Sequence, residues 1–160
     1  VSYPEMVLMA NGTPVIVAAG IEQDFKITAE QLEATITEKT KALILCSPSN
    51  PTGSVYSREE LAALAAVLER HPQVYVIADE IYEHISFADT PASIASVPGM
   101  KERTVVCNGV SKAYAMTGYR IGWLASHDKE LLTAVKRLQG QTISCATTIA
   151  QKAAEAAFLL

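Results

Sequence analysis

Hydrophobic residues in this chain form short runs that alternate with segments of helical periodicity. Five apolar runs have the length typical of buried strands: 14–18, 42–46, 74–78, 104–107 and 121–125. Between and after them, Leu and Val recur at intervals of three and four residues, most regularly at 61–68 and 131–138. The pattern predicts strands that alternate with helices.

Helix boundaries are marked by local capping signals. Thr28 is followed three residues later by Gln31, and Ser57 by Glu60, which are the spacings of two capping boxes. We expect a short first helix around Pro4, and an end to the 61–68 helix near His71. The last helical pattern begins after 128 and continues through an Ala-rich segment at 146–158, with a kink or break expected at Gly140.

Strands that are apolar on both faces and alternate with helices indicate an α/β domain. We therefore expect a three-layer fold, with a mostly parallel sheet and helices on both of its faces, in which residues 1–160 form a single domain. Ligands of such folds bind at the carboxyl ends of the strands. Asn50 follows one predicted strand, Asp79 ends the next, and residues 108–112 follow a third.

Composition narrows the function classes. Of 160 residues, 49% are hydrophobic, and 13 Lys and Arg against 17 Asp and Glu give a net charge of −4. We expect no nucleic-acid partner, because there is no basic tract, and no membrane partner, because no apolar run approaches the roughly 20 residues that cross a bilayer. Three widely spaced cysteines predict neither disulfides nor a metal site, which favours a reducing, cytoplasmic location.

The ends of the sequence favour a piece of a larger protein. It begins at Val1 without an initiator Met and stops on the apolar residues 158–160.

Six polar residues near the predicted strand ends have ordinary explanations when taken singly, as turn formers or surface charges. Together they form the set that covalent chemistry with a pyridine aldehyde cofactor requires. The set comprises an amine (Lys112), a carboxylate for the ring nitrogen (Asp79), donors to the ring oxygen (Tyr82 and Asn50) and phosphate ligands (Ser111 and Arg120).

Three stretches, "SPSNPTGSVYSREEL", "VIADEIYEHISF" and "NGVSKAYAMTGYRIGW", closely resemble the class I/II, fold type I aminotransferases that use pyridoxal 5'-phosphate. Their order and spacing also match, and the third stretch looks most like bacterial aspartate aminotransferases. The resemblance covers essentially the whole chain. It implies the central part of the cofactor-binding large domain, without the small C-terminal domain.

The resemblance also implies a role for each residue of the set. Lys112 would be the covalent anchor of pyridoxal phosphate and the acid/base that moves a proton at the substrate α-carbon. Asp79 would pair with the ring nitrogen, and Tyr82 and Asn50 would bond the ring oxygen. Asn50 would also contact the substrate carboxylate, through a motif in which its bond to Pro51 is typically cis.

The phosphate ligands implied by the resemblance are Ser111 and Arg120. Gly109 stands where some members have a hydroxyl residue, and Tyr119 where a Trp is common in this subgroup.

The function expected from this resemblance is transfer of an amino group from an amino acid, such as aspartate or an aromatic amino acid, to a 2-oxo acid. The longer parent protein would be a homodimer, and the 160-residue piece is expected to be inactive alone. A carbon–sulfur lyase of the same fold is one alternative. A non-catalytic aminotransferase-like module, which senses a ligand within a transcription regulator, is the other.

Overall fold

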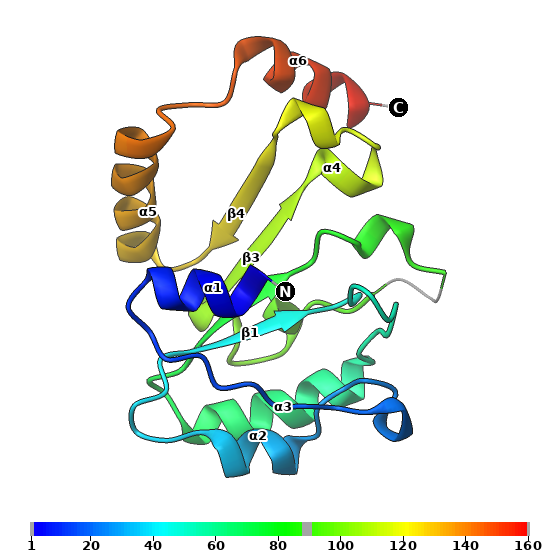
Figure 1. Ribbon diagram of the computed structural model, residues 1–160, viewed down its shortest axis with the longest axis vertical. Helices are drawn as coiled ribbons and strands as arrows, with labels where there is room; N and C mark the ends of the chain where they lie inside the picture. The colour runs from blue at the N-terminus through cyan, green and yellow to red at the C-terminus, as the bar shows by residue number, and fades with distance from the viewer. Residues whose placement is uncertain (1, 88–90, 160) are drawn as a thin grey trace.

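The computed structural model describes residues 2–87 and 91–159. Its helices and strands, in chain order, are α1 (Ser2–Met9), α2 (Ala29–Thr35), β1 (Ala42–Cys46), α3 (Arg58–Arg70), β2 (Tyr75–Asp79), β3 (Thr104–Gly109), α4 (Val110–Ala113), β4 (Gly122–Ser126), α5 (Lys129–Thr142) and α6 (Thr148–Ala157) (Figure 1). Short 3₁₀ turns lie between them at Ile21–Gln23, Glu83–Ile85, Ile94–Ser96, Lys101–Arg103 and Thr117–Tyr119. Four of the predicted strands are therefore confirmed, β1 with the predicted bounds and the others with ends shifted by at most two residues.

The sheet has the order β1-β2-β3-β4. β1, β2 and β3 are parallel, and β4 pairs antiparallel with β3. The expected α/β fold with a mostly parallel sheet is confirmed. The antiparallel strand follows from the connection 110–121, whose short helix and turn lead the chain back along β3 without crossing the sheet.

The two faces of the sheet differ because side chains alternate along each strand. On β2, Val76 and Ala78 are buried against α3, whereas Tyr75 and Asp79 lie on the opposite face. Helices α2 and α3 cover the first face, and α1 lies on the other (Figure 1). The hydroxyl of Tyr75 donates to the carboxylate of Asp128, the N-cap of α5, so α5 begins on the same side as α1. Helices therefore lie on both faces, as predicted.

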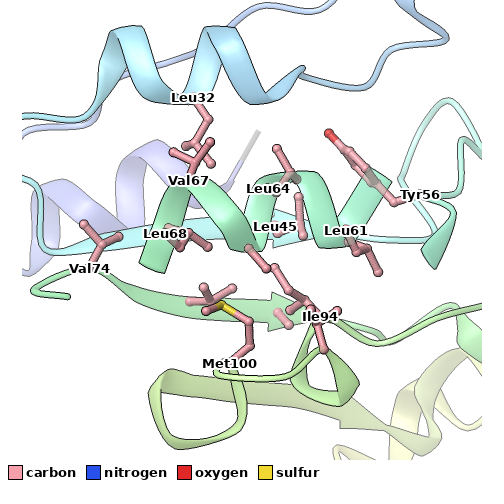
Figure 2. Packing of buried hydrophobic residues seen from close by; sticks show 14 residues of the cluster. Leu32, Leu45, Tyr56, Leu61, Leu64, Val67, Leu68, Val74, Ile94 and Met100 are labelled. Carbon is pink, nitrogen blue, oxygen red and sulfur yellow. The ribbon is translucent and has the colours of Figure 1, made fainter. Parts of the chain in front are cut away.

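The hydrophobic core lies between α3 and the sheet. Leu61, Leu64 and Leu68 of α3 point toward the strands and are almost fully buried, together with Val76 and Met100 (Figure 2). Both predicted capping boxes are present: Thr28 and Gln31 begin α2, and Ser57 and Glu60 begin α3. The core thus fixes β1 and β2 against a helix whose start is encoded locally.

The predicted strand at 14–18 is wrong. This segment has no pairing partner among the described residues, and Val15 and Ile16 are 69% and 76% exposed. Strand propensity forms a strand only where a neighbouring edge accepts its backbone hydrogen bonds.

Of the kink or break expected at Gly140, the break is wrong. Helix α5 continues through Gly140 to Thr142, and a separate helix, α6, begins after the N-cap Thr147.

Candidate functional site

The ends of three strands lie at the same level of the sheet. Cys46 of β1 pairs with Asp79 of β2, and Asp79 pairs with Cys107 of β3. The segments that follow these strands therefore leave the sheet at one edge, which is where parallel sheets bind ligands. Four of the six predicted site residues lie on these segments, Asp79 is the last residue of β2, and Arg120 lies just before β4.

The loop after β1 brings Asn50 to Tyr82. The amide Nδ2 of Asn50 donates to the hydroxyl oxygen of Tyr82 at 3.0 Å. The loop closes on itself, because the N–H of Gly53 donates to the carbonyl of Ser49, and Gly53 has a φ of +74° that favours glycine. The bonds Ser47–Pro48 and Asn50–Pro51 are both cis, so the cis peptide expected at Asn50 is confirmed.

Asp79 is held on both carboxylate oxygens. The backbone N–H of Ile81 donates to Oδ1 at 3.2 Å, and the hydroxyl of Tyr3 donates to Oδ2 at 2.7 Å. Burial raises the pKa of Tyr3 well above its usual range, and its contacts with Cys46 and Asp79 raise it further. The contact of Tyr3 with Asp79 was not predicted from the sequence, because Tyr3 lies 76 positions from its partner and belongs to none of the three motifs.

Lys112 is placed by the tight junction between β3 and α4. A Cβ atom at Gly109 would lie 2.7 Å from the carbonyl oxygen of Ile121, so only glycine fits where β3 meets the start of β4. The fold thus gives a packing reason for the absent hydroxyl at this position. Lys112 is exposed, and its Nζ lies 5.8 Å from the ring centroid of Tyr82.

The two predicted phosphate ligands are placed differently. Ser111 adjoins Lys112 on α4 and is half-buried. Arg120 is exposed, has a left-handed backbone with φ of 54°, and its Nη1 donates to the carbonyl of Thr117 at 2.8 Å. The described contacts join Asn50 and Lys112 to Tyr82, and they do not join Arg120 to the other five residues.

Cys107 lies beside Asp79 but has the properties of a buried thiol. Burial raises the pKa of Cys107, and the carboxylates of Asp79 and Glu80 raise it further. A raised pKa opposes thiolate formation, which a nucleophilic cysteine needs. All three cysteines are free, and no group of His, Cys, Asp and Glu in the described ranges is arranged to hold a metal ion. Within the same ranges, no helix is both long and apolar enough to cross a membrane.

Comparison with known proteins finds relatives that are named as aminotransferases. The family profile of aminotransferase class I and II matches residues 1–159. The chain is 58% identical over 158 residues to the aspartate/prephenate aminotransferase of Cereibacter sphaeroides, covering 96% of this chain and 39% of that protein. It is 52% identical to the bifunctional aspartate aminotransferase and glutamate/aspartate-prephenate aminotransferase of Petunia hybrida, covering 98% and 33%.

Comparison with solved structures also finds aminotransferases. The aspartate aminotransferase of Rhizobium meliloti matches with a TM-score of 0.90 and 45% identity, over 94% of this chain and 38% of that one. The enzyme of Thermotoga maritima matches with a TM-score of 0.93 and 39% identity, over 100% and 42%. The chain thus spans about a third to two fifths of the length of these proteins. By sequence and by fold, it belongs to the class I and II aminotransferase family.

Proposed function

We propose that this chain supplies the lysine-bearing part of an aminotransferase site that binds pyridoxal 5'-phosphate. The whole protein would transfer an amino group from an amino acid such as aspartate, or an aromatic amino acid, to a 2-oxo acid. The observation that carries the proposal is the convergence of Lys112, the Asn50–Tyr82 pair and Asp79 at one edge of the sheet. Relatives named aspartate/prephenate aminotransferases support the substrate class.

The donor set fits this cofactor. The hydrogen bond from Asn50 to Tyr82 uses one amide hydrogen and a lone pair of the tyrosyl oxygen. It leaves the tyrosyl proton and the second amide hydrogen available to an anionic ring oxygen. Asp79 keeps at least one lone pair on each carboxylate oxygen to accept a ring N–H. The hydroxyl of Ser111 and the guanidinium of Arg120 are the chemistry that a phosphate requires.

The role proposed for each side chain follows from its position in the site. Bound pyridoxal phosphate supplies an electron sink for the pair left when the substrate α-carbon loses its proton. Lys112, an exposed amine beside the Tyr82 ring, would hold the aldehyde carbon by displacing its oxygen as water, and would carry the proton to and from the substrate α-carbon. The Asp79 carboxylate would hold the proton on the ring nitrogen. Tyr82 and the free amide hydrogen of Asn50 would orient the ring through its oxygen, and a contact of Asn50 with the substrate carboxylate would use the amide hydrogen that now bonds Tyr82.

The finer properties of the whole protein belong to the same proposal. Free thiols support a reducing, cytoplasmic location, and we propose a homodimer. The relatives named as aminotransferases favour amino transfer over the lyase and ligand-sensing alternatives. Since the chain spans about a third to two fifths of their length, we expect the isolated chain to load cofactor without sustained turnover.

The test is to map where the cofactor attaches. The chain is incubated with pyridoxal phosphate, its visible spectrum is recorded, the adduct is reduced with borohydride, and the modified peptide is identified by mass spectrometry. We expect selective modification of Lys112, lost in Lys112→Ala and retained in Lys101→Ala, a control at an exposed lysine outside the site. Labelling spread over surface lysines, or equal labelling of Lys112→Ala, would overturn the proposal.

A further inference from the structure

We propose that Tyr3 is a positioning residue of the cofactor site: its hydroxyl, delivered by α1, fixes the Asp79 carboxylate in the orientation that receives the cofactor ring nitrogen. This inference rests on the proposed function and extends it to a residue outside the three motifs. It starts from the hydrogen bond of 2.7 Å between the Tyr3 hydroxyl and Oδ2 of Asp79.

The two donors to Asp79 act on different oxygens. The N–H of Ile81 lies only two residues along the chain and fixes Oδ1, at 3.2 Å. The terminal torsion of an aspartate side chain is soft, so this one hydrogen bond of 3.2 Å restrains it only weakly. The bond from Tyr3 to Oδ2 is shorter and comes from another element, so it removes this freedom. A hydrogen bond to a charged acceptor is also among the stronger ones in proteins.

The side chains beside Asp79 in the sheet are weaker hydrogen-bond donors than the Tyr3 hydroxyl. The residues paired with Asp79 on the neighbouring strands are Cys46 and Cys107, and thiols are weak hydrogen-bond donors. Tyr3 is half-buried, and its raised pKa keeps the hydroxyl protonated, and so a donor, over the whole physiological range.

Helix α1 places the Tyr3 side chain next to Asp79. Pro4 lies in the first turn, where its missing N–H leaves no helical hydrogen bond unmade. The helix ends where the N–H of Gly12 donates to the carbonyl of Val7. It lies on the Asp79 side of the sheet, away from α3 (Figure 1). Tyr3 therefore contacts Asp79 from the face of the sheet on which α1 lies, whereas Ile81 is a neighbour of Asp79 along the chain.

The test compares two tyrosine–aspartate pairs. Tyr3→Phe removes the hydroxyl that bonds Asp79, and Tyr75→Phe removes the hydroxyl that bonds Asp128 at 2.8 Å, away from the site. Affinity for pyridoxal phosphate is measured by absorbance titration. The ¹⁵N shift of the labelled ring nitrogen reports its protonation, and far-UV circular dichroism checks the fold. We expect Tyr3→Phe to weaken cofactor binding about three- to tenfold and to shift the ring-nitrogen signal toward the unprotonated form. Tyr75→Phe should stay within twofold of wild type.

A second background shows whether Tyr3 acts through Asp79. In Asp79→Ala the carboxylate is absent, so adding Tyr3→Phe should change cofactor affinity no further. Suppose that the wild-type chain takes up the cofactor on Lys112. If Tyr3→Phe then binds the cofactor as tightly as wild type, or more tightly, the role of Tyr3 is overturned and the proposed function stays intact. A further loss in the Asp79→Ala background would do the same. If the wild-type chain takes up no cofactor on Lys112, the proposed function fails, and this role fails with it.

Discussion

Two neighbouring acidic residues have different environments because of the strand pleat. Asp79 lies on the α1 face of the sheet and accepts hydrogen bonds from Tyr3 and Ile81. Glu80 is only 9% exposed and lies near Ala78 and Ile94 of the core. Burial raises the pKa of Glu80, a hydrogen bond from Ser93 offsets part of this, and the nearby carboxylates of Glu83 and Asp79 raise it further. The same dipeptide thus supplies one proposed site residue and one buried carboxyl group.

Glu80→Gln should therefore stabilise the protein at neutral pH. A carboxyl group with a raised pKa in the folded state stabilises the fold fully only below its unfolded pKa, and the contribution is lost as the pH rises through the folded value. Removing the charge should increase the free energy of unfolding at pH 7 and change it little at pH 4. Urea titrations at both pH values measure this, with the exposed Glu38→Gln as a control. A variant less stable than wild type at pH 7 would show that the charged form is favoured.

Among the elements, α3 is closed at its C-terminal end by a side chain from another segment. Nη1 of Arg103 donates to the carbonyl of Leu68 at 2.6 Å, and its Nε and Nη2 donate to the carbonyl of Val74. Nη2 also bonds the carbonyl of His71, the C-cap residue. One guanidinium thus adds charged donors to three carbonyls at and after the end of α3, of which those of Leu68 and His71 also accept a backbone N–H. It also joins the end of α3 to the approach to β2.

We expect Arg103→Ala to lower the free energy of unfolding by about 2 kcal/mol or more, because half-buried carbonyls lose charged donors. Arg103→Lys should recover only part of this loss, since an ammonium cannot span three carbonyls. Chemical unfolding measures both variants, and Arg58→Ala, at the exposed start of α3, is the matched control. Equal stability of Arg103→Ala and Arg58→Ala would exclude the capping role.

The whole molecule exposes more surface than its mass requires. Its accessible surface is 10589 Å², whereas a compact monomer of this mass exposes roughly 7,800 Å². This surface includes large apolar side chains that are more than two-thirds exposed: Met9, Val15, Ile16, Ile21, Phe87, Leu138, Ile143, Ile149 and Leu159. Scattered apolar residues are normal on surfaces, but this number, carried largely by α1, α5, α6 and their adjoining segments, is typical of association surfaces.

We therefore expect the 160-residue chain to self-associate. Light scattering over a wide range of concentration should give a mass that rises above that of the monomer, and raised salt should not reverse the rise, because burial of apolar surface is its cause. A monomer at every concentration would contradict this expectation.

Much of the fold and site was predictable from adjacent residues. Capping boxes at Thr28 and Ser57, and the buried runs of β1 to β3, are local patterns, and all appear in the structure. The grouping of Asn50 with Tyr82 followed from strand ends that meet at one edge. The contact of Tyr3 with Asp79 was not predictable, because no rule of spacing links residues 76 positions apart.

The sequence by itself determined the family, the order of the four paired strands and of most helices, and the chemical groups available at the strand ends. These depend on interactions within a few residues, or on motifs that are read directly. Tertiary structure alone decided that the run 14–18 is not a strand, that β4 is antiparallel, and that Tyr3 bonds Asp79. Each of these depends on which distant backbone or side chain is within reach, because hydrogen bonds act only at contact distance and the partner's position is set by the packing of the whole chain.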